Sequence, residues 1–211
     1  VVVADVNLEA AQETAEACGN GSFAIALDVS NADAVRQTVA DLIQKLEKLD
    51  NLVNNAGINR DAMLHKMTDA EWDSVLAVDL SGVFYMCREV GTHMRTNQYG
   101  RVVNVASASW MGNIGQTNYA AAKGGVVSLT KSISQVLAFK NVTANAICPG
   151  FILTEMTKAI PEKIFNQQLE RIPLGRAGEP EDVANLVAFL ASDDASYLTG
   201  EVINIGGGYK L

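Results

Sequence analysis

Tyr119 and Lys123 stand four residues apart in a segment whose pattern predicts a helix from about residue 116. This spacing puts both side chains on one helix face, within reach of each other. A phenol titrates near about 10, and a neighbouring ammonium favours the phenolate, so we expect Lys123 to lower the pKa of Tyr119. Ser107 follows an apolar run at 101–105, and its hydroxyl can donate to a substrate oxygen. The three side chains together suit proton transfer to or from a carbonyl or alcohol oxygen.

Apolar runs typical of strands alternate with helical patterns along the whole chain. The apolar runs lie at residues 1–6, 23–27, 52–53, 101–106, 142–147 and 202–205. The helical patterns cover residues 8–18, about 30–48, about 69–95, 116–138 and 180–190. Because the runs are continuous and not alternating, they predict strands buried on both faces. We therefore expect one α/β domain over residues 1–211, with a doubly wound, Rossmann-like parallel sheet in three α/β/α layers.

Short motifs mark where three of the helices should begin. Thr68 and Glu71 have the spacing of a capping box, and Ser30 with Asp33 resembles one. Pro180 stands where a first helical position would be. Residues 150–175 lack such a signal and read as a mobile stretch.

Polar or turn-forming residues follow several of the expected strands. In parallel sheets ligands bind beyond the carboxyl ends of the strands, near the point where the strand order reverses. The residues at those ends are Asp5, Asp28, Asn54 to Gly57, Ser107 and Pro149-Gly150. Core packing alone does not explain so many unusual strand ends on one edge, so we expect a binding site there.

Composition excludes several classes of function. The net charge of −8 over 211 residues argues against nucleic acid and anionic membrane surfaces as partners. Charged residues interrupt every apolar run before it could span a bilayer, and we expect no signal peptide. Three widely spaced cysteines predict free thiols, and the two histidines lack the spacing of metal ligands. We expect a cytoplasmic protein, or one of an organelle matrix if a transit peptide lies upstream.

The motifs occur in an order that resembles the short-chain dehydrogenase/reductase family over the whole chain. Asn54-Asn55-Ala56-Gly57 is similar to the family's sheet-stabilising motif beside the cofactor. Ser107, Tyr119 and Lys123 resemble its catalytic residues, and Pro149-Gly150 with Thr154 resembles its nicotinamide-side motif. Within the family, the segments 57–61, 112–119 and 149–156 are most similar to 3-oxoacyl-(acyl carrier protein) reductases.

The resemblance implies a role for each of these side chains. Tyr119 would be the acid in reduction and the base in oxidation, Lys123 would lower its pKa and bind the nicotinamide ribose, and Ser107 would hold the substrate oxygen. The cofactor would supply the hydride. The residues expected to bind it are Asp5, Asp28, Val29, Asn55, Ala56, Gly57, Tyr119, Lys123, Pro149, Gly150, Ile152 and Thr154.

The chain departs from the family pattern in three places. The glycine-rich turn that seats a pyrophosphate at a helix N-terminus is absent, as if the first strand and helix of the fold were missing. The only glycine cluster, Gly206 to Gly208, is at the wrong end, and a turn or close subunit packing explains it better.

The other two departures concern the catalytic set itself. Asp79 stands where many members have an Asn that holds a water of a proton relay; it could serve in that relay or be a helix residue without chemistry. The segment between Ser107 and Tyr119 is one residue short, so that counting back from Tyr119 reaches Ala106, which has no hydroxyl. We keep Ser107 as the candidate, with Ser109 as the second choice.

The first interpretation is an oxidoreductase that reduces 3-oxoacyl thioesters to 3-hydroxyacyl thioesters, acting as a homotetramer on a small or carrier-linked acyl substrate. Two alternatives stay open. One is another secondary-alcohol dehydrogenase, acting on a sugar, steroid or polyol. The other is a non-catalytic, scaffold-like subunit.

The cofactor is expected to be NAD(H), with NADP(H) possible. A carboxylate at Asp5 can accept hydrogen bonds from the ribose hydroxyls of NAD and would repel the 2′-phosphate of NADP. No Lys or Arg lies between residues 1 and 31 to offset that repulsion. Against this, the carrier-protein reductases that the chain resembles usually use NADPH. In an alternative interpretation, Asp5 only caps the helix that follows.

Overall fold

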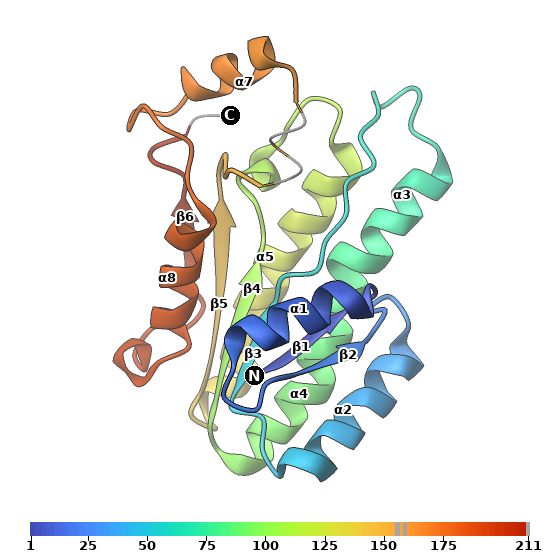
Figure 1. The fold of residues 1–211 in the computed structure, drawn as a ribbon, viewed down its shortest axis with the longest axis vertical. Coiled ribbons are helices and arrows are strands. Elements are labelled where there is room, and N and C mark those ends of the chain that lie inside the picture. The colour runs from blue at the N-terminus through green and yellow to red at the C-terminus, as the bar shows by residue number, and fades with distance from the viewer. Residues whose placement is uncertain (155–156, 158–159, 210–211) are drawn as a thin grey trace.

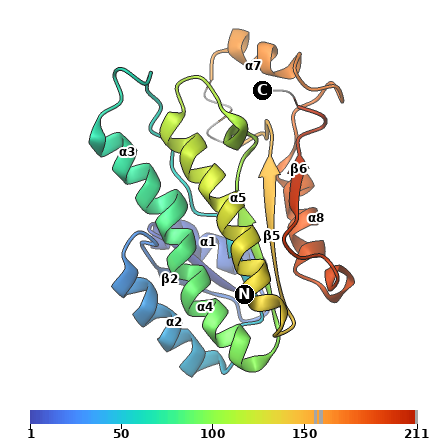
Figure 2. The same ribbon diagram turned by 180° about the vertical axis from the view of Figure 1, so that it is seen from behind.

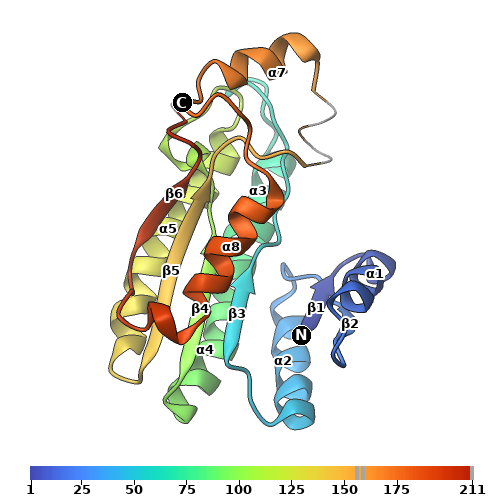
Figure 3. The ribbon, with the colours of Figure 1, turned by 60° about the vertical axis from the view of Figure 1, so that its left-hand side comes forward.

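The computed structural model describes residues 1–154, 157 and 160–209, and all its strand pairs are parallel (Figure 1). The strands are β1 Val2–Asp5, β2 Phe23–Ala26, β3 Asn51–Asn54, β4 Gly100–Val105, β5 Val142–Pro149 and β6 Val202–Ile205. They form two sheets instead of the single one expected: β1 pairs with β2, and the other four run in the order β3-β4-β5-β6. Figure 3 shows the first pair set apart from β3, and no described strand lies between β1 and β3.

Helices cover both faces of the strands, which confirms the expected three-layer α/β/α class. The helices are α1 Leu8–Cys18, α2 Ala32–Leu46, α3 Asp69–Leu76, α4 Val83–Asn97, α5 Thr117–Ala138, α7 Glu162–Leu169 and α8 Pro180–Leu190. Helices α1 and α8 lie in front of the strands in Figure 1, whereas α2, α4 and α5 cover the face seen in Figure 2. None of the helices in the described ranges is long and apolar enough to cross a membrane.

Helix starts agree with the sequence signals in two of three cases. The Thr68 hydroxyl accepts from the Glu71 N–H at 3.2 Å, and the Glu71 carboxylate accepts from the Thr68 N–H at 2.8 Å, so this capping box is confirmed. Pro180 is the first residue of α8. The expected box at Ser30 is wrong, because Asn31 caps α2 with its side-chain oxygen while the Ser30 hydroxyl donates to Asp28.

The long helix expected over about 69–95 is interrupted by a π-helix at Ala77–Gly82, between α3 and α4. A π-helical turn inserts one extra residue per turn and is frequent at functional sites. Gly82 ends this turn against the segment that follows β2: a Cβ atom on Gly82 would lie 2.7 Å from Val29 Cγ2. A side chain at this position would therefore push the two segments apart.

The stretch at 150–175 contains a helix, α7, that the sequence did not indicate. The turn at Gly206 to Gly208 packs on the start of this stretch: a Cβ atom on Gly150 would lie 2.9 Å from Gly206 Cα. Gly207 and Gly208 adopt φ of 60° and 83°, conformations that favour glycine. The cluster is thus a turn packed within the chain. Of the motif at 149–156, Glu155 and Met156 lie outside the described residues.

A chain of buried polar groups joins the sheet to two helices. The Asn54 side chain donates to Asn104 Oδ1 at 2.8 Å and to Cys87 Sγ at 3.2 Å, and Asn104 donates to Thr130 Oγ1 at 2.9 Å. The Thr130 hydroxyl in turn donates to the Val126 carbonyl. These groups come from β3, β4, α4 and α5, and a fully satisfied network of this kind specifies one arrangement of those elements.

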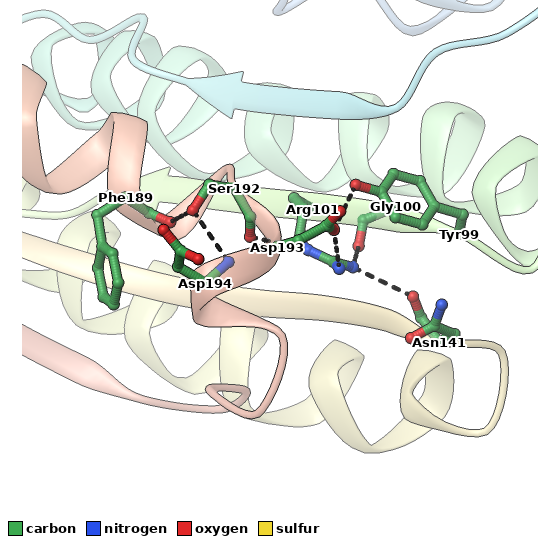
Figure 4. A network of polar contacts seen from close by, with 8 residues as sticks. All are labelled: Tyr99, Gly100, Arg101, Asn141, Phe189, Ser192, Asp193 and Asp194. Carbon is green, nitrogen blue, oxygen red and sulfur yellow. Dashed lines mark hydrogen bonds and ion pairs between the residues drawn. The ribbon is translucent and has the colours of Figure 1, made fainter.

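A second network holds the amino end of β4 (Figure 4). The Arg101 side chain is 2% exposed; its Nη2 lies 2.9 Å from Asp193 Oδ1, and its Nη1 donates to the Gly100 and Asn141 carbonyls. The Tyr99 hydroxyl donates to the same Asp193 oxygen at 2.9 Å. The network ties the start of β4 to the turn that follows α8, at the opposite end of β4 from Ser107.

We predict that Asp193→Asn lowers the melting temperature without changing kcat at 25 °C. The change leaves the buried Arg101 guanidinium without its counter-charge, but the exposed carboxylate is partly screened, so the cost should be about 1 kcal/mol. For a chain of this length that cost corresponds to roughly 2–4 °C. Asp194→Asn, in the adjacent exposed position, is the matched control. Equal melting temperatures for the two variants would contradict the role given to Asp193.

Candidate active site

Ser107, Tyr119 and Lys123 are brought together where β4 meets the first turns of α5. Ser107 directly precedes a 3-10 helix at Ala108–Met111, and its hydroxyl hydrogen-bonds with the Tyr119 phenol. Lys123 Nζ lies 5.4 Å from the centre of the Tyr119 ring, so both side chains share one helix face as predicted. The second choice, Ser109, instead donates to Gln116 Oε1 at 3.0 Å.

Lys123 is buried and held by two partners. Its Nζ donates to the Val105 carbonyl at 3.0 Å and lies 3.3 Å from Asp79 Oδ2. The side chains of Lys123 and Asp79 are 3% and 0% exposed. The other Asp79 oxygen, Oδ1, accepts from the Ile58 N–H at 2.8 Å. The π-helix thus carries its carboxylate directly to Lys123, the candidate catalytic lysine.

The expectation that Lys123 lowers the pKa of Tyr119 is wrong for this structure. Burial raises the pKa of Tyr119 to about 12; the charge of Asp79 adds to the rise, the Ser107 hydrogen bond opposes it, and Asp61 contributes a smaller increase. Burial also lowers the pKa of Lys123 and raises that of Asp79, while the attraction between the two opposes both shifts. The sequence pattern identified Lys123 beside Tyr119, but it did not indicate that the Asp79 carboxylate pairs with this lysine.

Gly57 allows the β3–α3 segment to lie directly on this ion pair. A Cβ atom on Gly57 would be 2.8 Å from Asp79 Oδ2 and 3.4 Å from Lys123 Nζ. The first of these distances is shorter than any real Cβ contact, so another side chain here would displace the carboxylate. The glycine of the expected cofactor motif therefore also has a packing role.

Asn118, which the sequence analysis did not single out, anchors the first turn of α5. It is fully buried, and its side-chain amide donates to the Arg60 carbonyl at 2.9 Å and to the Glu71 carbonyl at 3.0 Å. Its Oδ1 accepts from the Tyr119 N–H at 2.8 Å. Asn118 thereby fixes Tyr119 relative to the segment that follows β3. The sequence feature that could have identified Asn118 is its position in the first turn of α5, next to the candidate catalytic tyrosine.

Two loops near the start of α5 contact each other. The Gln116 amide donates to both Asp61 oxygens, at 3.3 and 3.0 Å, and the Ala62 N–H donates to the Gly115 carbonyl at 2.9 Å. The segments 57–61 and 112–119, which carried the subgroup resemblance, thus contact each other. No local pattern predicts this pairing, because it joins residues more than fifty positions apart.

Two cavities with shared walls gather most of the residues expected to bind a cofactor. A cavity of about 300 Å³ is lined by Asp5, Asp28, Val29, Asn55, Ala56 and Gly57, among others. A more apolar cavity of about 510 Å³ is lined by Asn55, Pro149, Ile152 and Thr154, together with side chains of α8. Val53 and Asn55 contribute to both linings. Gly150 is not in either lining and instead packs against Gly206.

The chemistry of the two linings fits the two ends of a nicotinamide dinucleotide. The exposed carboxylates of Asp5 and Asp28 suit ribose hydroxyls, and the apolar cavity beside Pro149 and Thr154 suits a flat, uncharged ring. Asp5 accepts from the Asn7 N–H at 2.8 Å, whereas Asn7 itself caps α1. The alternative that Asp5 caps this helix is therefore wrong.

Cys148 adjoins the site but does not have the properties of a nucleophile. Burial raises the pKa of its thiol to about 11, although a hydrogen bond from the Ser107 backbone and the Lys123 charge both oppose the rise. A thiol nucleophile needs the opposite shift. All three cysteines are free, as predicted.

Known proteins are similar to this chain over most or all of its length. A short-chain dehydrogenase/reductase family model, described as enoyl-(acyl carrier protein) reductase, matches residues 1–210. The 3-oxoacyl-(acyl-carrier-protein) reductase FabG of Thermotoga maritima is 45% identical over 215 residues, covering 100% of this chain and 87% of that protein. The acetoacetyl-CoA reductase of Rhizobium meliloti is 49% identical over 183 residues, covering 86% and 76%. The FabG reductase of Staphylococcus aureus is 44% identical over 204 residues, covering 96% and 83%.

Proposed function

The chain belongs to the short-chain dehydrogenase/reductase family, and from that premise we propose that it reduces 3-oxoacyl thioesters to 3-hydroxyacyl thioesters with a nicotinamide dinucleotide. The observation that carries this proposal is the contact of Ser107, Tyr119 and Lys123 beside the two cavities. The relatives named for 3-oxoacyl-carrier-protein and acetoacetyl-CoA reduction support the thioester class. No comparable observation favours a sugar, steroid or polyol.

The side chains divide the work of the proton transfer. The Ser107 hydroxyl donates a hydrogen bond to the carbonyl oxygen of the substrate, and the Tyr119 phenol gives its proton to that oxygen as the carbonyl is reduced. The bound cofactor supplies the hydride. Lys123 contributes positive charge beneath Tyr119 and binds the ribose. Asp5, Asp28, Val29 and the residues from Asn55 to Gly57 hold the adenosine side, while Pro149, Ile152 and Thr154 hold the nicotinamide side.

A substrate panel tests the proposed class directly. Acetoacetyl-CoA and an acetoacetyl carrier protein should both be reduced, whereas ketosugars, ketosteroids and cyclic ketones should give far lower kcat/KM. A higher kcat/KM for any of these ketones than for both thioesters would assign the enzyme to another secondary-alcohol class. If the enzyme reduced none of these ketones and neither thioester, only the interpretation as a non-catalytic, scaffold-like subunit would remain.

We predict that Tyr119→Phe folds and binds dinucleotide normally but loses nearly all turnover. The ring and its packing are kept and only the acid is removed, and such groups contribute about 10²–10⁴-fold. The measurement is kcat with acetoacetyl-CoA, alongside dinucleotide binding by fluorescence. Tyr85→Phe, on α4 and outside the site, is the matched control. A Tyr119→Phe enzyme with more than half of the normal kcat would exclude Tyr119 as the acid.

The proposed cofactor preference is for NAD(H) over NADP(H). Asp5 and Asp28 both line the cavity proposed for the adenosine ribose, and a 2′-phosphate there would meet two carboxylates. Like charges a few ångströms apart, partly shielded from water, cost on the order of 1–4 kcal/mol. The first basic residue of the sequence is Arg36. The relatives' names do not specify a cofactor.

We predict a kcat/KM at least roughly tenfold higher with NADH than with NADPH, a difference of about 1.4 kcal/mol. Asp5→Ala should lose most of that margin, because it removes one of the two repelling charges. Asp33→Ala, an exposed carboxylate in the first turn of α2, is the control and should keep the margin. A preference for NADPH in the unaltered enzyme would show that the ribose pocket has been assigned incorrectly.

The proposed assembly is a homotetramer, and the proposed compartment is the cytoplasm, where free thiols persist. Helices α4 and α5 leave large apolar side chains exposed on their outer surface, and such surfaces mark interfaces. Phe84 is 43%, Val136 63% and Phe139 90% exposed. The last two residues of the sequence, Lys210 and Leu211, lie outside the described range.

We predict a particle of four times the chain mass of 22.5 kDa by light scattering at micromolar concentration. Phe139→Ser should shift the distribution toward smaller particles, because it removes the most exposed of these apolar groups. Asn97→Ser, at the end of α4, serves as the control. A monomer in the unaltered protein would refute the tetramer while leaving the proposed reaction untouched.

A further inference from the structure

Among the carboxylates in the part of the chain that the structure describes, Asp79 alone is buried, and it lies against Lys123. The π-helix between α3 and α4 carries it, the Gly57 backbone covers it, and Lys123 faces it. One of its oxygens accepts from the Ile58 N–H, and the other lies 3.3 Å from the lysine ammonium in an ion pair without a hydrogen bond. At 0% exposure the carboxylate has no open side toward solvent.

The contacts of the pair favour the ionised form of each partner. A backbone N–H that donates to Asp79 stabilises the carboxylate, and a backbone carbonyl that accepts from Lys123 stabilises the ammonium. Two opposite charges 3.3 Å apart in a poorly solvated site also attract each other strongly. We therefore treat the two side chains as a buried ion pair, with the positive charge of Lys123 largely balanced.

We infer that Asp79 is an electrostatic positioning residue: paired with Lys123, it withholds the ammonium charge from Tyr119 and so moves proton transfer at this site to higher pH than a neutral residue at position 79 would. The inference rests on the proton-transfer role proposed for Tyr119. The rise in the pKa of Tyr119 caused by Asp79 has the direction that this inference requires.

The other charged and titratable groups around the pair have smaller or opposing effects. Asp61, from the loop after β3, raises the pKa of Tyr119 less than Asp79 does. The Ser107 hydroxyl lowers it. Cys148, at the end of β5, faces Lys123 as a neutral thiol, because burial raises its pKa to about 11. Asp79 is therefore the residue whose charge can be removed with the largest effect.

The relay role expected for Asp79 fits this geometry less well. A relay needs an oxygen that a water molecule can reach, yet Asp79 is fully buried: its Oδ1 accepts from the Ile58 N–H, and its Oδ2, which accepts no hydrogen bond, faces the Lys123 ammonium beneath Gly57. The role of balancing the Lys123 charge requires only the ion pair between Asp79 and Lys123, which the structure shows. The two roles also differ in their consequence: loss of a relay lowers kcat at all pH values, whereas loss of a charge moves the pH profile.

The test is the isosteric change Asp79→Asn, which keeps the shape and removes the charge. Without the carboxylate the phenolate of Tyr119 is more stable, so its pKa falls. Oxidation of a 3-hydroxyacyl thioester needs Tyr119 as a base, and the acid limb of log kcat should move to lower pH by roughly one unit. On that limb the variant should turn over 3-hydroxybutyryl-CoA about tenfold faster than the unaltered enzyme at the same pH.

Three companion variants keep the result interpretable. Asp73→Asn makes the same change at an exposed position of α3 and should leave the profile unmoved. Asp61→Asn should move it in the same direction by a smaller amount. Asp79→Ser, neutral and smaller, repeats the measurement if the amide is not tolerated at this buried position.

A readout that needs no substrate separates this inference from the proposed reaction. The chain has five tyrosines, so subtracting the Tyr119→Phe spectrum isolates the tyrosinate absorbance of Tyr119. That absorbance should rise at lower pH in Asp79→Asn than in the unaltered protein. If it does while no thioester is turned over, the reaction is wrong and the inference stands. Unchanged titration and an unchanged pH profile in both Asp79 variants would overturn the inference.

Discussion

The buried hydrogen-bond chain centred on Asn104 is the constraint on which the catalytic geometry depends. Its amide joins β3 to α5 through Asn54 and Thr130, at 2.8 and 2.9 Å, inside an otherwise apolar core. A buried amide without partners would cost about 1–3 kcal/mol, so each alternative packing of strand and helix is penalised. The arrangement that satisfies these groups also fixes the end of β4, which leads to Ser107, against the helix that carries Tyr119 and Lys123.

Local signals were sufficient to predict most of the fold. Continuous apolar runs identified all six strands, and the interval of four residues between Tyr119 and Lys123 placed both on one helix face, because these features depend only on neighbouring residues. The placement of Asn55 and Ser107 at one edge also followed from sequence, since β3 and β4 are parallel strands of the same sheet. The capping box at Thr68 was correct for the same local reason.

The features that sequence did not predict all depend on contacts between distant segments. The π-helix at Ala77–Gly82 has no local motif, and it forms where Gly82 can approach Val29 closely. The burial of Asn118 and its bonds to Arg60 and Glu71 are visible only once α5 is packed. The rise in the pKa of Tyr119 has the same origin: desolvation and the Asp79 charge come from the tertiary structure.

The burial of Lys123 sets stability against chemistry. An unpaired ammonium that is 3% exposed is strongly destabilising, so a fold that places it beneath Tyr119 has to supply a counter-charge. Asp79 supplies that charge, but the same carboxylate makes the phenolate of Tyr119 less stable. Stabilising the lysine and activating the tyrosine therefore draw on the same positive charge. The residue at position 79 decides how that charge is divided, because a neutral amide there would leave more of it to the phenol and less compensation for the buried lysine.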